Sequence, residues 1–351
     1  MAAPASRAGD RAALRAAFLQ AAGWGAAASR PLAGDASFRR YDRLQMGGTT
    51  AVLMDAPPGQ EDVRPFLQVA GLLHQAGLSA PAVLAADEPQ GFILLEDLGD
   101  ALFTGLASDP EVEAEIYSAA VDMLAVLHAR HPAEMPALRS LPPQDHGLLR
   151  GGLDTFLDWY WPAAHGAPAS PALRQEFLDL WQPLLQQVRP ASDDGADVLV
   201  MRDYHADNLI WLPARNGPAR VGLLDFQDAV LGHPAYDLVS LLDDVRREVA
   251  RPLAADLLRR YLRERGLADS GRGASHFEAG YAIFGAQRNI RILGVFVRLW
   301  RRDGKARYLD YLPRTRSMLD HALRHPALAE VAAWFSEHLP PEAGLPGRTG
   351  R

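Results

Sequence analysis

Two aspartates and an asparagine have the residue types and spacing needed for phosphoryl transfer. Asp203 precedes Asn208 by five residues, and Asp225 follows a further apolar segment. One aspartate can orient and deprotonate an alcohol, while an asparagine and a later aspartate can hold Mg²⁺ against nucleotide phosphates. A lone Asp in a turn often only caps its own backbone. The three residues together therefore predict a catalytic base, Asp203, and two metal ligands, Asn208 and Asp225.

Polar residues near this motif have both a structural and a functional interpretation. Asp237 follows a Gly-His-Pro segment and is expected to cap a helix or brace the loop. His205 could stabilise the loop or contact a substrate, and Arg202 could orient the base or pair at the surface. Asp228 follows Asp225 closely enough to support it or to meet a substrate. The candidate substrate-binding residues are thus Arg202, His205, Asp228 and Arg288.

Arg288 lies in an otherwise apolar segment, residues 277–300, which is expected to form a buried helix. A buried arginine is costly unless an anionic group compensates it. We therefore expect Arg288 to pair with an acidic residue such as Asp228 or to meet an anionic group of the substrate. The polar residues that interrupt this segment also make it a poor membrane span.

The first part of the chain offers two places for a nucleotide. Gly34, Asp35, Ala36 and Ser37 form a tight turn that could present backbone N–H groups and a hydroxyl to phosphates. Residues 94–99 have the features of a hinge, where backbone groups of Glu96 and Leu98 would bond adenine. A simple hairpin turn and a simple strand end remain the alternatives.

The composition narrows the class of protein. The 351 residues suffice for two lobes, and a net charge of −7 argues against sequence-independent nucleic-acid binding, which needs excess cations. The absence of cysteine excludes disulfides, Cys-ligated zinc and thiol nucleophiles. Arg15 and Gln20 interrupt the alanine-rich start, which favours an amphipathic helix over an export signal. We expect a cytoplasmic, monomeric enzyme acting on a small molecule, without nucleic-acid or membrane partners.

The elements that must position these residues fall into a strand-rich first part and a helical remainder. Residues 37–45 and 49–54 predict a hairpin, and a helix at 61–76 with strands at 82–86 and 92–95 completes a small sheet. Strand-like residues 197–201 and 221–225 flank the loop. We place an N-lobe at 1–97 and a C-lobe at 98–351. The helices expected in the C-lobe span 111–130, 152–161, 172–188, 235–249, 252–265, 276–300 and 307–323.

This order of elements resembles the protein-kinase-like fold, and more narrowly the aminoglycoside phosphotransferase and choline kinase superfamily. The loop of that superfamily reads His-Gly-Asp-x-x-x-x-Asn, and here Met201-Arg202 replaces His-Gly. Gly232-His233-Pro234-x-x-Asp237 is similar to the Gly-Asp-Pro-x-x-Asp that follows it. The resemblance covers residues 30 to 325. It implies an α+β, bilobal fold with a small antiparallel sheet plus helix in the N-lobe, a larger helical C-lobe, ATP as co-substrate and Mg²⁺.

Three longer stretches look similar to the bacterial anomeric kinases of N-acetylmuramate and N-acetylglucosamine. They are residues 34–41, residues 53–58, and residues 287–294 with 302–305. In that family the C1 hydroxyl of the sugar receives the γ-phosphate of ATP, which serves peptidoglycan recycling. The resemblance therefore implies a sugar 1-kinase.

One departure from the superfamily concerns the phosphate clamp. Kinase-like enzymes carry a lysine in the third strand, but the only lysine here is Lys305. Arg39 and Arg40 are the candidates to neutralise the phosphates, and alternation along a strand would send them to opposite faces. We favour Arg40.

Other classes of protein remain open at this stage. A phosphotransferase for an aminoglycoside or another small alcohol would carry the same loop. A metal-dependent hydrolase could use His205 and His233 with the nearby aspartates. The missing lysine would also suit a pseudokinase, but Asp203, Asn208 and Asp225 argue against one.

Overall fold

The computed structural model describes residues 4–32, 38–130, 132–188, 197–269 and 271–340. These residues divide into two compact units, which we describe separately. The first unit holds the chain up to residue 107 together with 208–228, and the second holds 108–207 and the chain from 229 onward. Residues 208–228 belong to the first unit because Trp211 N donates to Ala101 O at 2.8 Å and Leu223 N donates to Ser79 O at 2.9 Å.

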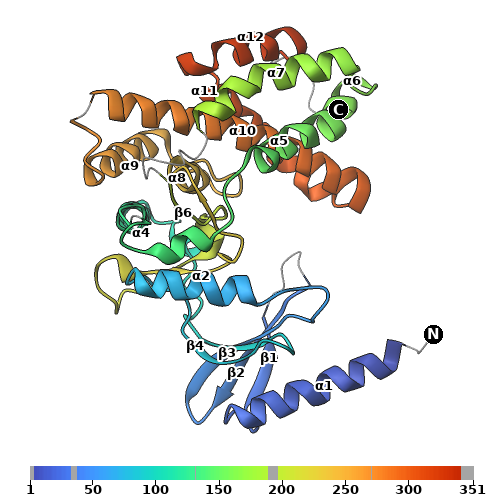
Figure 1. The fold of residues 1–351 in the computed structure, drawn as a ribbon, viewed down its shortest axis with the longest axis vertical. Helices are drawn as coiled ribbons and strands as arrows, with labels where there is room; N and C mark the ends of the chain where they lie inside the picture. The colour runs from blue at the N-terminus through green and yellow to red at the C-terminus, as the bar shows by residue number, and fades with distance from the viewer. Residues whose placement is uncertain (1–3, 33–37, 131, 189–196, 270, 341–351) are drawn as a thin grey trace. The chain divides into compact units, whose positions relative to one another are not determined.

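The first unit is built on an antiparallel sheet of five strands in the order β1-β2-β3-β5-β4 (Figure 1). Gly47 and Gly48 join β2 to β3 with φ angles of 56° and 84°, which glycine adopts without a Cβ penalty. This confirms the expected hairpin and small sheet. The strands are β1 (Ala28–Pro31), β2 (Arg40–Met46), β3 (Thr49–Asp55), β4 (Val83–Asp87) and β5 (Phe92–Glu96).

Helices and a second hairpin complete this unit. Helix α1 (Pro4–Ala21) buries Phe18 in a core that the sheet supplies with leucines and Phe92. Helix α2 (Arg64–Gln75) presents Phe66, which stacks on Phe226 with ring centroids 4.9 Å apart. Phe226 follows the hairpin, so this contact fixes the segment that carries Asp225. The remaining elements are α3 (Phe103–Leu106), β7 (Leu209–Trp211), η4 (Gly217–Arg220) and β8 (Val221–Leu223).

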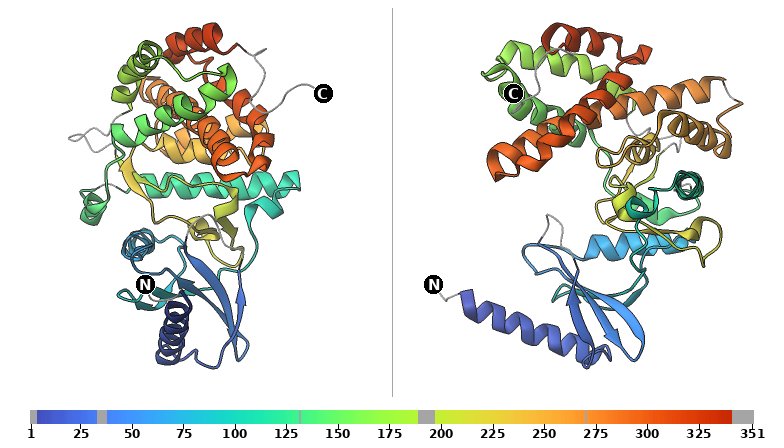
Figure 2. Two further views of the ribbon diagram at one scale, coloured as in Figure 1. Left: turned by 90° about the vertical axis from the view of Figure 1, so that its right-hand side faces the viewer. Right: turned by 180° about the vertical axis from the view of Figure 1, so that it is seen from behind.

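The second unit is mostly helical, apart from β6 (Val198–Val200), which pairs antiparallel with β9 (Val230–Gly232). The long helix α10 crosses the unit, as Figures 1 and 2 show from three sides. The helices are α4 (Pro110–His128), η1 (Pro136–Ser140), α5 (His146–Thr155), η2 (Phe156–Tyr160), α6 (Trp161–His165), α7 (Pro171–Gln187), η3 (Ala206–Asn208), α8 (Ala235–Leu242), α9 (Arg251–Glu264), α10 (Gly271–Asp303), η5 (Ala306–Tyr311), α11 (Leu312–Ala322), η6 (Pro326–Leu328) and α12 (Ala329–His338).

One expected helix ends too early in the structure, and another helix was missed. The helix expected at 235–249 ends at Leu242, because Asp243 and Asp244 follow, and acidic side chains are unfavourable at a helix C-terminus. Helix α12 was not expected at all. No helix within the described ranges is long and apolar enough to cross a membrane.

Helix α10 approaches its neighbours closely at one glycine. A Cβ on Gly294 would lie 2.6 Å from the carbonyl oxygen of Thr155 and 2.7 Å from the nitrogen of Phe156. Both contacts are to backbone, which cannot give way as the end of a side chain can. Glycine at 294 thus permits the packing that fixes α10, and with it Arg288, against α5 and η2.

Candidate active site

The first unit carries the two expected metal ligands on its β7–β8 hairpin. Asn208 directly precedes β7, and its carbonyl oxygen accepts from Leu224 N at 2.9 Å. This bond brings the backbone of the residue before Asp225 against the backbone of Asn208, although the sequence separates them. Asp225 adopts a φ of 55°, which is a strained backbone conformation for a residue other than glycine.

Arg39 forms an ion pair with Asp225. Its Nη2 lies 3.7 Å from Asp225 Oδ1, and its Nε lies 3.7 Å from Glu61 Oε2. The side chain of Arg39 is 14% exposed and that of Asp225 is 35% exposed. Tyr41 lies beside these charges, and burial raises its pKa. An arginine, a glutamate and the aspartate expected to bind metal thus meet in one unit.

The preference for Arg40 stays a prediction, but the ion pair to Asp225 is formed by Arg39. Arg40 is exposed and makes no ion pair to any residue that the structure describes. The physical reason is that β2 begins at Arg40, so Arg39 precedes the strand and the alternation of strand side chains does not govern it. Arg39 is therefore the arginine that the fold directs toward Asp225.

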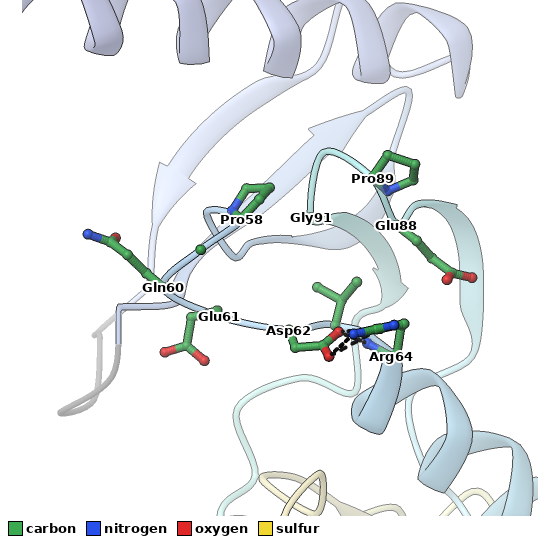
Figure 3. A pocket seen from close by; sticks show the side chains of 10 residues that line it. Pro58, Gln60, Glu61, Asp62, Arg64, Glu88, Pro89 and Gly91 are labelled. Atoms are coloured by element: carbon green, nitrogen blue, oxygen red, sulfur yellow. Dashed lines mark hydrogen bonds and ion pairs between the residues drawn. The ribbon is translucent and has the colours of Figure 1, made fainter.

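The loop that supplies Glu61 is itself anchored. Asp62 accepts from the backbone nitrogen of Arg64 at 3.0 Å and holds its guanidinium at 2.7 Å, as the dashed lines in Figure 3 show. Glu61 accepts from Phe38 N at 3.0 Å. The same loop lines a surface pocket with the turn between β4 and β5 (Figure 3). These bonds hold Glu61 in place to pair with Arg39.

The structure describes only some of the residues expected to bind the nucleotide. Gly34, Asp35, Ala36 and Ser37 lie outside the described residues. The backbone nitrogen of Glu96 donates to Ala82 O at 2.8 Å, so an adenine could use only its carbonyl. The Glu96 side chain pairs with Arg215. Leu98 follows β5, in the segment expected to act as a hinge, and its role stays a prediction.

The second unit holds the expected base in a tight turn after β6. Asp203 N donates to Met201 O at 2.9 Å, and Arg202 between them has a φ of 69°. A three-residue turn with a positive central φ is a rare and strained form of γ-turn. Arg202 occupies the position where the superfamily pattern has glycine, so this chain carries the strain on an arginine.

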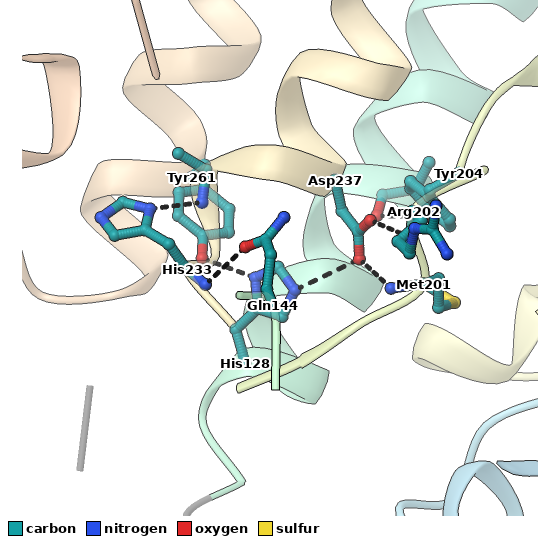
Figure 4. A network of polar contacts seen from close by, with 10 residues as sticks. His128, Gln144, Met201, Arg202, Tyr204, His233, Asp237 and Tyr261 are labelled. Atoms are coloured by element: carbon teal, nitrogen blue, oxygen red, sulfur yellow. Dashed lines mark hydrogen bonds and ion pairs between the residues drawn. The ribbon is translucent and has the colours of Figure 1, made fainter. Parts of the chain in front are cut away.

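The buried side chain of Asp237 supports this turn. Its side chain is 0% exposed, and its two oxygens accept from Met201 N at 2.7 Å and Arg202 N at 2.8 Å (Figure 4). Two charge-assisted hydrogen bonds to successive amides fix the backbone that leads into Asp203. The expected bracing role of Asp237 is confirmed.

The sequence analysis missed His128, which supports Asp237. His128 Nε2 lies 3.8 Å from Asp237 Oδ2, and its Nδ1 lies 2.7 Å from the Tyr261 hydroxyl (Figure 4). Burial lowers the pKa of His128, so the ring is neutral at neutral pH. Its position at the end of a helical pattern gave no signal, because its partners are distant in sequence. Tyr204 adds a further anchor by donating to Ala120 O at 3.0 Å.

The candidate substrate residues fall in both units. Asp228 is exposed in the first unit, and Gln227 Nε2 lies 3.5 Å from its Oδ2. His205 is buried in the second unit, where burial and then the charges of Arg246 and Arg288 lower its pKa to about 2. Arg288 is buried too and donates to Ser240 Oγ at 3.0 Å. Within the described part of its unit, Arg288 forms no ion pair with an acidic side chain.

The comparisons with known proteins agree with this fold. Residues 28–274 match the phosphotransferase enzyme family, and the chain belongs to that family. Its fold is protein-kinase-like: a putative aminoglycoside phosphotransferase from Ralstonia eutropha matches with a TM-score of 0.60 and 19% identity, covering 85% of this chain and 92% of that one. A choline/ethanolamine kinase family protein from Mesorhizobium loti matches with a TM-score of 0.58 and 16% identity, covering 93% and 98%.

Two relatives are similar to this chain over most of its length. The N-acetylmuramate/N-acetylglucosamine kinase of Caulobacter vibrioides is 41% identical over 95% of this chain and 98% of its own length. The protein of the same name from Pseudomonas aeruginosa is 36% identical over 89% of each chain. The resemblance expected from the sequence is confirmed, and the chain is similar to kinases of these two sugars.

Proposed function

We propose that this protein is an ATP-dependent sugar kinase that phosphorylates the anomeric C1 hydroxyl of N-acetylmuramate and N-acetylglucosamine. The observation that carries the proposal is 41% identity to a kinase of that name over nearly the full length of both chains. We also propose that the enzyme acts as a cytoplasmic monomer in peptidoglycan recycling.

Asp203 is the proposed base. Its carboxylate accepts a hydrogen bond from the C1 hydroxyl and holds the oxygen lone pair in line with the γ-phosphorus. The proton passes to Asp203 late, because phosphoryl transfer has a loose transition state. Asp237 supports this role, since its two bonds fix the backbone at Met201 and Arg202. Pre-organisation of the base is the contribution of the second unit.

Asn208 and Asp225 suit Mg²⁺. An amide oxygen and a carboxylate are hard donors, and Mg²⁺ prefers one or two such protein ligands together with phosphates and water. The bond from Leu224 N to Asn208 O supports this assignment, because it joins the backbone of Asn208 to the residue before Asp225. The ion, when bound, neutralises charge on the phosphates. A metal-dependent hydrolase is less well supported, because residues 28–274 match the phosphotransferase enzyme family.

Arg39 is the proposed replacement for the strand lysine. It is directed toward Asp225 and is positioned by Glu61, much as a kinase lysine is positioned by a glutamate. We propose that its guanidinium neutralises the nucleotide phosphates, while Glu96 and Leu98 bond adenine through backbone groups. The turn of Gly34, Asp35, Ala36 and Ser37 remains a proposed phosphate contact, and Arg40 becomes a control position.

A substrate panel tests the proposal. N-acetylmuramate, N-acetylglucosamine, other hexoses and aminoglycosides are each incubated with ATP or GTP and Mg²⁺, and ADP or GDP release is measured. We expect turnover of the two N-acetylated sugars, with phosphorus NMR showing an anomeric phosphate. Phosphorylation of aminoglycosides or of another alcohol instead would support the alternative phosphotransferase and refute the sugar assignment. Phosphate release without any acceptor would contradict the kinase proposal.

A further inference from the structure

Arg43 on β2 holds two carboxylates of the segment that follows β5 in the first unit. Its Nε lies 2.8 Å from Asp97 Oδ2, and its Nη2 donates to Asp97 Oδ1 at 3.0 Å. Its Nη1 and Nη2 also donate to the two oxygens of Asp100, at 2.7 and 2.8 Å. A guanidinium presents its donors in a fixed fork, so paired contacts of this kind define the position of each carboxylate. Arg43 thus attaches both ends of residues 97–100 to the sheet.

The residues held by Arg43 form a turn around Leu98. Gly99 has a φ of 85°, and its N–H donates to Asp97 Oδ1 at 3.0 Å. The carbonyl of Asp100 accepts from Leu102 N at 2.8 Å. By contrast, the main chain of Leu98 makes no hydrogen bond to any residue that the structure describes. The turn therefore fixes the main chain of Leu98 and leaves its N–H and C=O available to a ligand.

The same turn is attached to the β7–β8 hairpin. A Cβ on Gly222 would lie 3.0 Å from Leu98 Cδ1, so the leucine side chain packs directly on β8. Just beyond the turn, Ala101 O accepts from Trp211 N of β7 at 2.8 Å. This hairpin leads into the two residues expected to bind metal. The segment expected to bind adenine and the segment expected to bind metal are therefore packed together within one unit.

The charges of the turn explain why it needs Arg43. Glu96, Asp97 and Asp100 place three carboxylates within five residues. Arg215 pairs with Glu96, whereas Arg43 holds the other two. The side chain of Asp97 is 7% exposed, and a buried carboxylate without a cationic partner is costly. Loss of the Arg43 guanidinium would also leave like charges that repel one another, and both effects would open the turn.

We propose that Arg43 is a positioning residue of the nucleotide site. By holding Asp97 and Asp100, it keeps the main chain of Leu98 in the conformation that bonds the adenine base. Because the turn also packs on the β7–β8 hairpin, the base and the metal-bound phosphates are held at a set separation. The inference rests on the proposed function, since it takes Leu98 as an adenine contact. Arg43 itself does not touch the nucleotide.

The test compares the binding of ADP with that of inorganic tripolyphosphate, each with Mg²⁺, by calorimetry. Tripolyphosphate has the charge of a phosphate chain but no base. We expect Arg43→Gln to weaken ADP binding about 10-fold or more, because a base site that must be ordered on binding loses affinity. Tripolyphosphate should bind as it does to the wild type. In kinetic assays the KM for ATP should rise, while kcat at saturating ATP should change little.

A double-mutant cycle shows whether Arg43 acts through the two carboxylates. In a protein that carries Asp97→Asn and Asp100→Asn, the effect of Arg43→Gln on ADP binding should fall to about threefold or less. An undiminished effect in that background would mean that Arg43 contacts the nucleotide directly, and would overturn the positioning role. Arg15→Gln is the matched control, because Arg15 pairs with another β2 residue, Asp42, at 3.0 Å. It should bind ADP as the wild type does.

The outcomes separate this inference from the proposed function. Unchanged ADP binding, or equal losses for ADP and tripolyphosphate, would overturn the inference alone. If tripolyphosphate binds too weakly to measure, the cycle on ADP decides. Arg43→Lys, which keeps the charge on a single nitrogen, should show an intermediate loss and replaces Arg43→Gln if that variant does not fold. A wild type that binds ADP but phosphorylates no sugar would overturn the sugar assignment and leave the role of Arg43 standing. One that binds no adenine nucleotide would overturn both.

Discussion

The base side and the phosphate side of the chemistry are held in different ways. In the second unit, Asp237 is 0% exposed and binds two backbone amides at 2.7 and 2.8 Å. In the first unit, Asp225 is 35% exposed and its ion pair with Arg39 spans 3.7 Å. Buried short hydrogen bonds define one geometry, whereas long, partly exposed ion pairs tolerate several. Under the proposed function, the protein pre-organises the base, and bound ligands complete the phosphate side.

Asp203→Asn should have the largest effect, because it removes the base and leaves the brace in place. We expect kcat to fall about 10²- to 10⁴-fold, the range for general base catalysis. The KM for ATP and the melting temperature should change little, since the variant leaves Arg39, Asp225 and Asp237 untouched. Steady-state kinetics and thermal unfolding provide the check. A kcat within a factor of three of the wild type would remove Asp203 from the role of base.

Asp237→Asn tests the brace on the same side. The asparagine side chain has one oxygen and one NH₂ group, so it can accept from only one of the two backbone N–H groups of Met201 and Arg202. One of the two buried hydrogen bonds is therefore lost. We expect a loss of about 3 kcal/mol in the free energy of unfolding and a lower kcat. Urea unfolding measures the first quantity. Asp122→Asn, which breaks the exposed pair with Arg260, is the matched control and should cost less than about 1 kcal/mol. Similar costs for both would mean that burial adds nothing at Asp237.

Local features of the sequence predicted the loop that carries Asp203, but not all of the contacts that support it. The spacing of Asp203, Asn208 and Asp225 and the stop of the strand before them are short-range signals. His128 was missed because its partner Asp237 lies over a hundred residues away, and its ring is typical of any helix end. Tertiary contacts of this kind leave no local pattern.

On the phosphate side, prediction from the sequence is limited for a different reason. Arg39 and Arg40 are the two proposed substitutes for the lysine, and the choice between them depends on where β2 begins. A shift of one residue in a strand boundary changes which side chain faces which way. The helix expected to continue to 249 failed for a similar reason, since its apolar spacing persists beyond the aspartates that end it at Leu242.

Arg39→Gln is expected to weaken the phosphate side alone. The KM for ATP should rise about 10-fold or more, as a charged contact to phosphate is lost. The stability should change little, because the ion pairs of Arg39 are long and partly exposed. Arg40→Gln is the control, since Arg40 is exposed, and its KM should match the wild type. The reverse result, with Arg40 mattering and Arg39 not, would restore the expectation from the sequence.

Acid should destabilise the protein through the buried His233 of the second unit. Burial lowers the pKa of His233 to about 4, whereas the unfolded chain binds that proton near pH 6.5. The stabilisation is fully present above pH 6.5 and is lost as pH falls, by about 1.4 kcal/mol at pH 5.5. Asp243 and Asp244 act oppositely, since burial raises their pKa. The measurement is therefore the difference between wild type and His233→Gln in urea unfolding at pH 7.5 and 5.5. An identical pH dependence in both proteins would refute it.

Backbone strain is the one property that both sides share, and it is expected to have the smallest effect. Arg202 has a φ of 69° and Asp225 a φ of 55°. A left-handed residue with a Cβ costs about 1–2 kcal/mol, while glycine loses about 0.5–1 kcal/mol through greater freedom in the unfolded chain. Arg202→Gly should therefore be more stable than Arg202→Ala by about 0.5–1 kcal/mol in urea unfolding. Both variants lack the side chain, so their difference reports the backbone alone.

The same pair of variants at Asp225 tests the phosphate side. If glycine is favoured over alanine at 202 and not at 225, only the turn held by Asp237 is strained in solution, because a looser segment can relax. Glycine favoured at both positions would show that the first unit also holds its backbone firmly. That outcome would reduce the contrast between the two sides to the exposure of their side chains. Alanine equal to or better than glycine at 202 would contradict strain in the γ-turn itself.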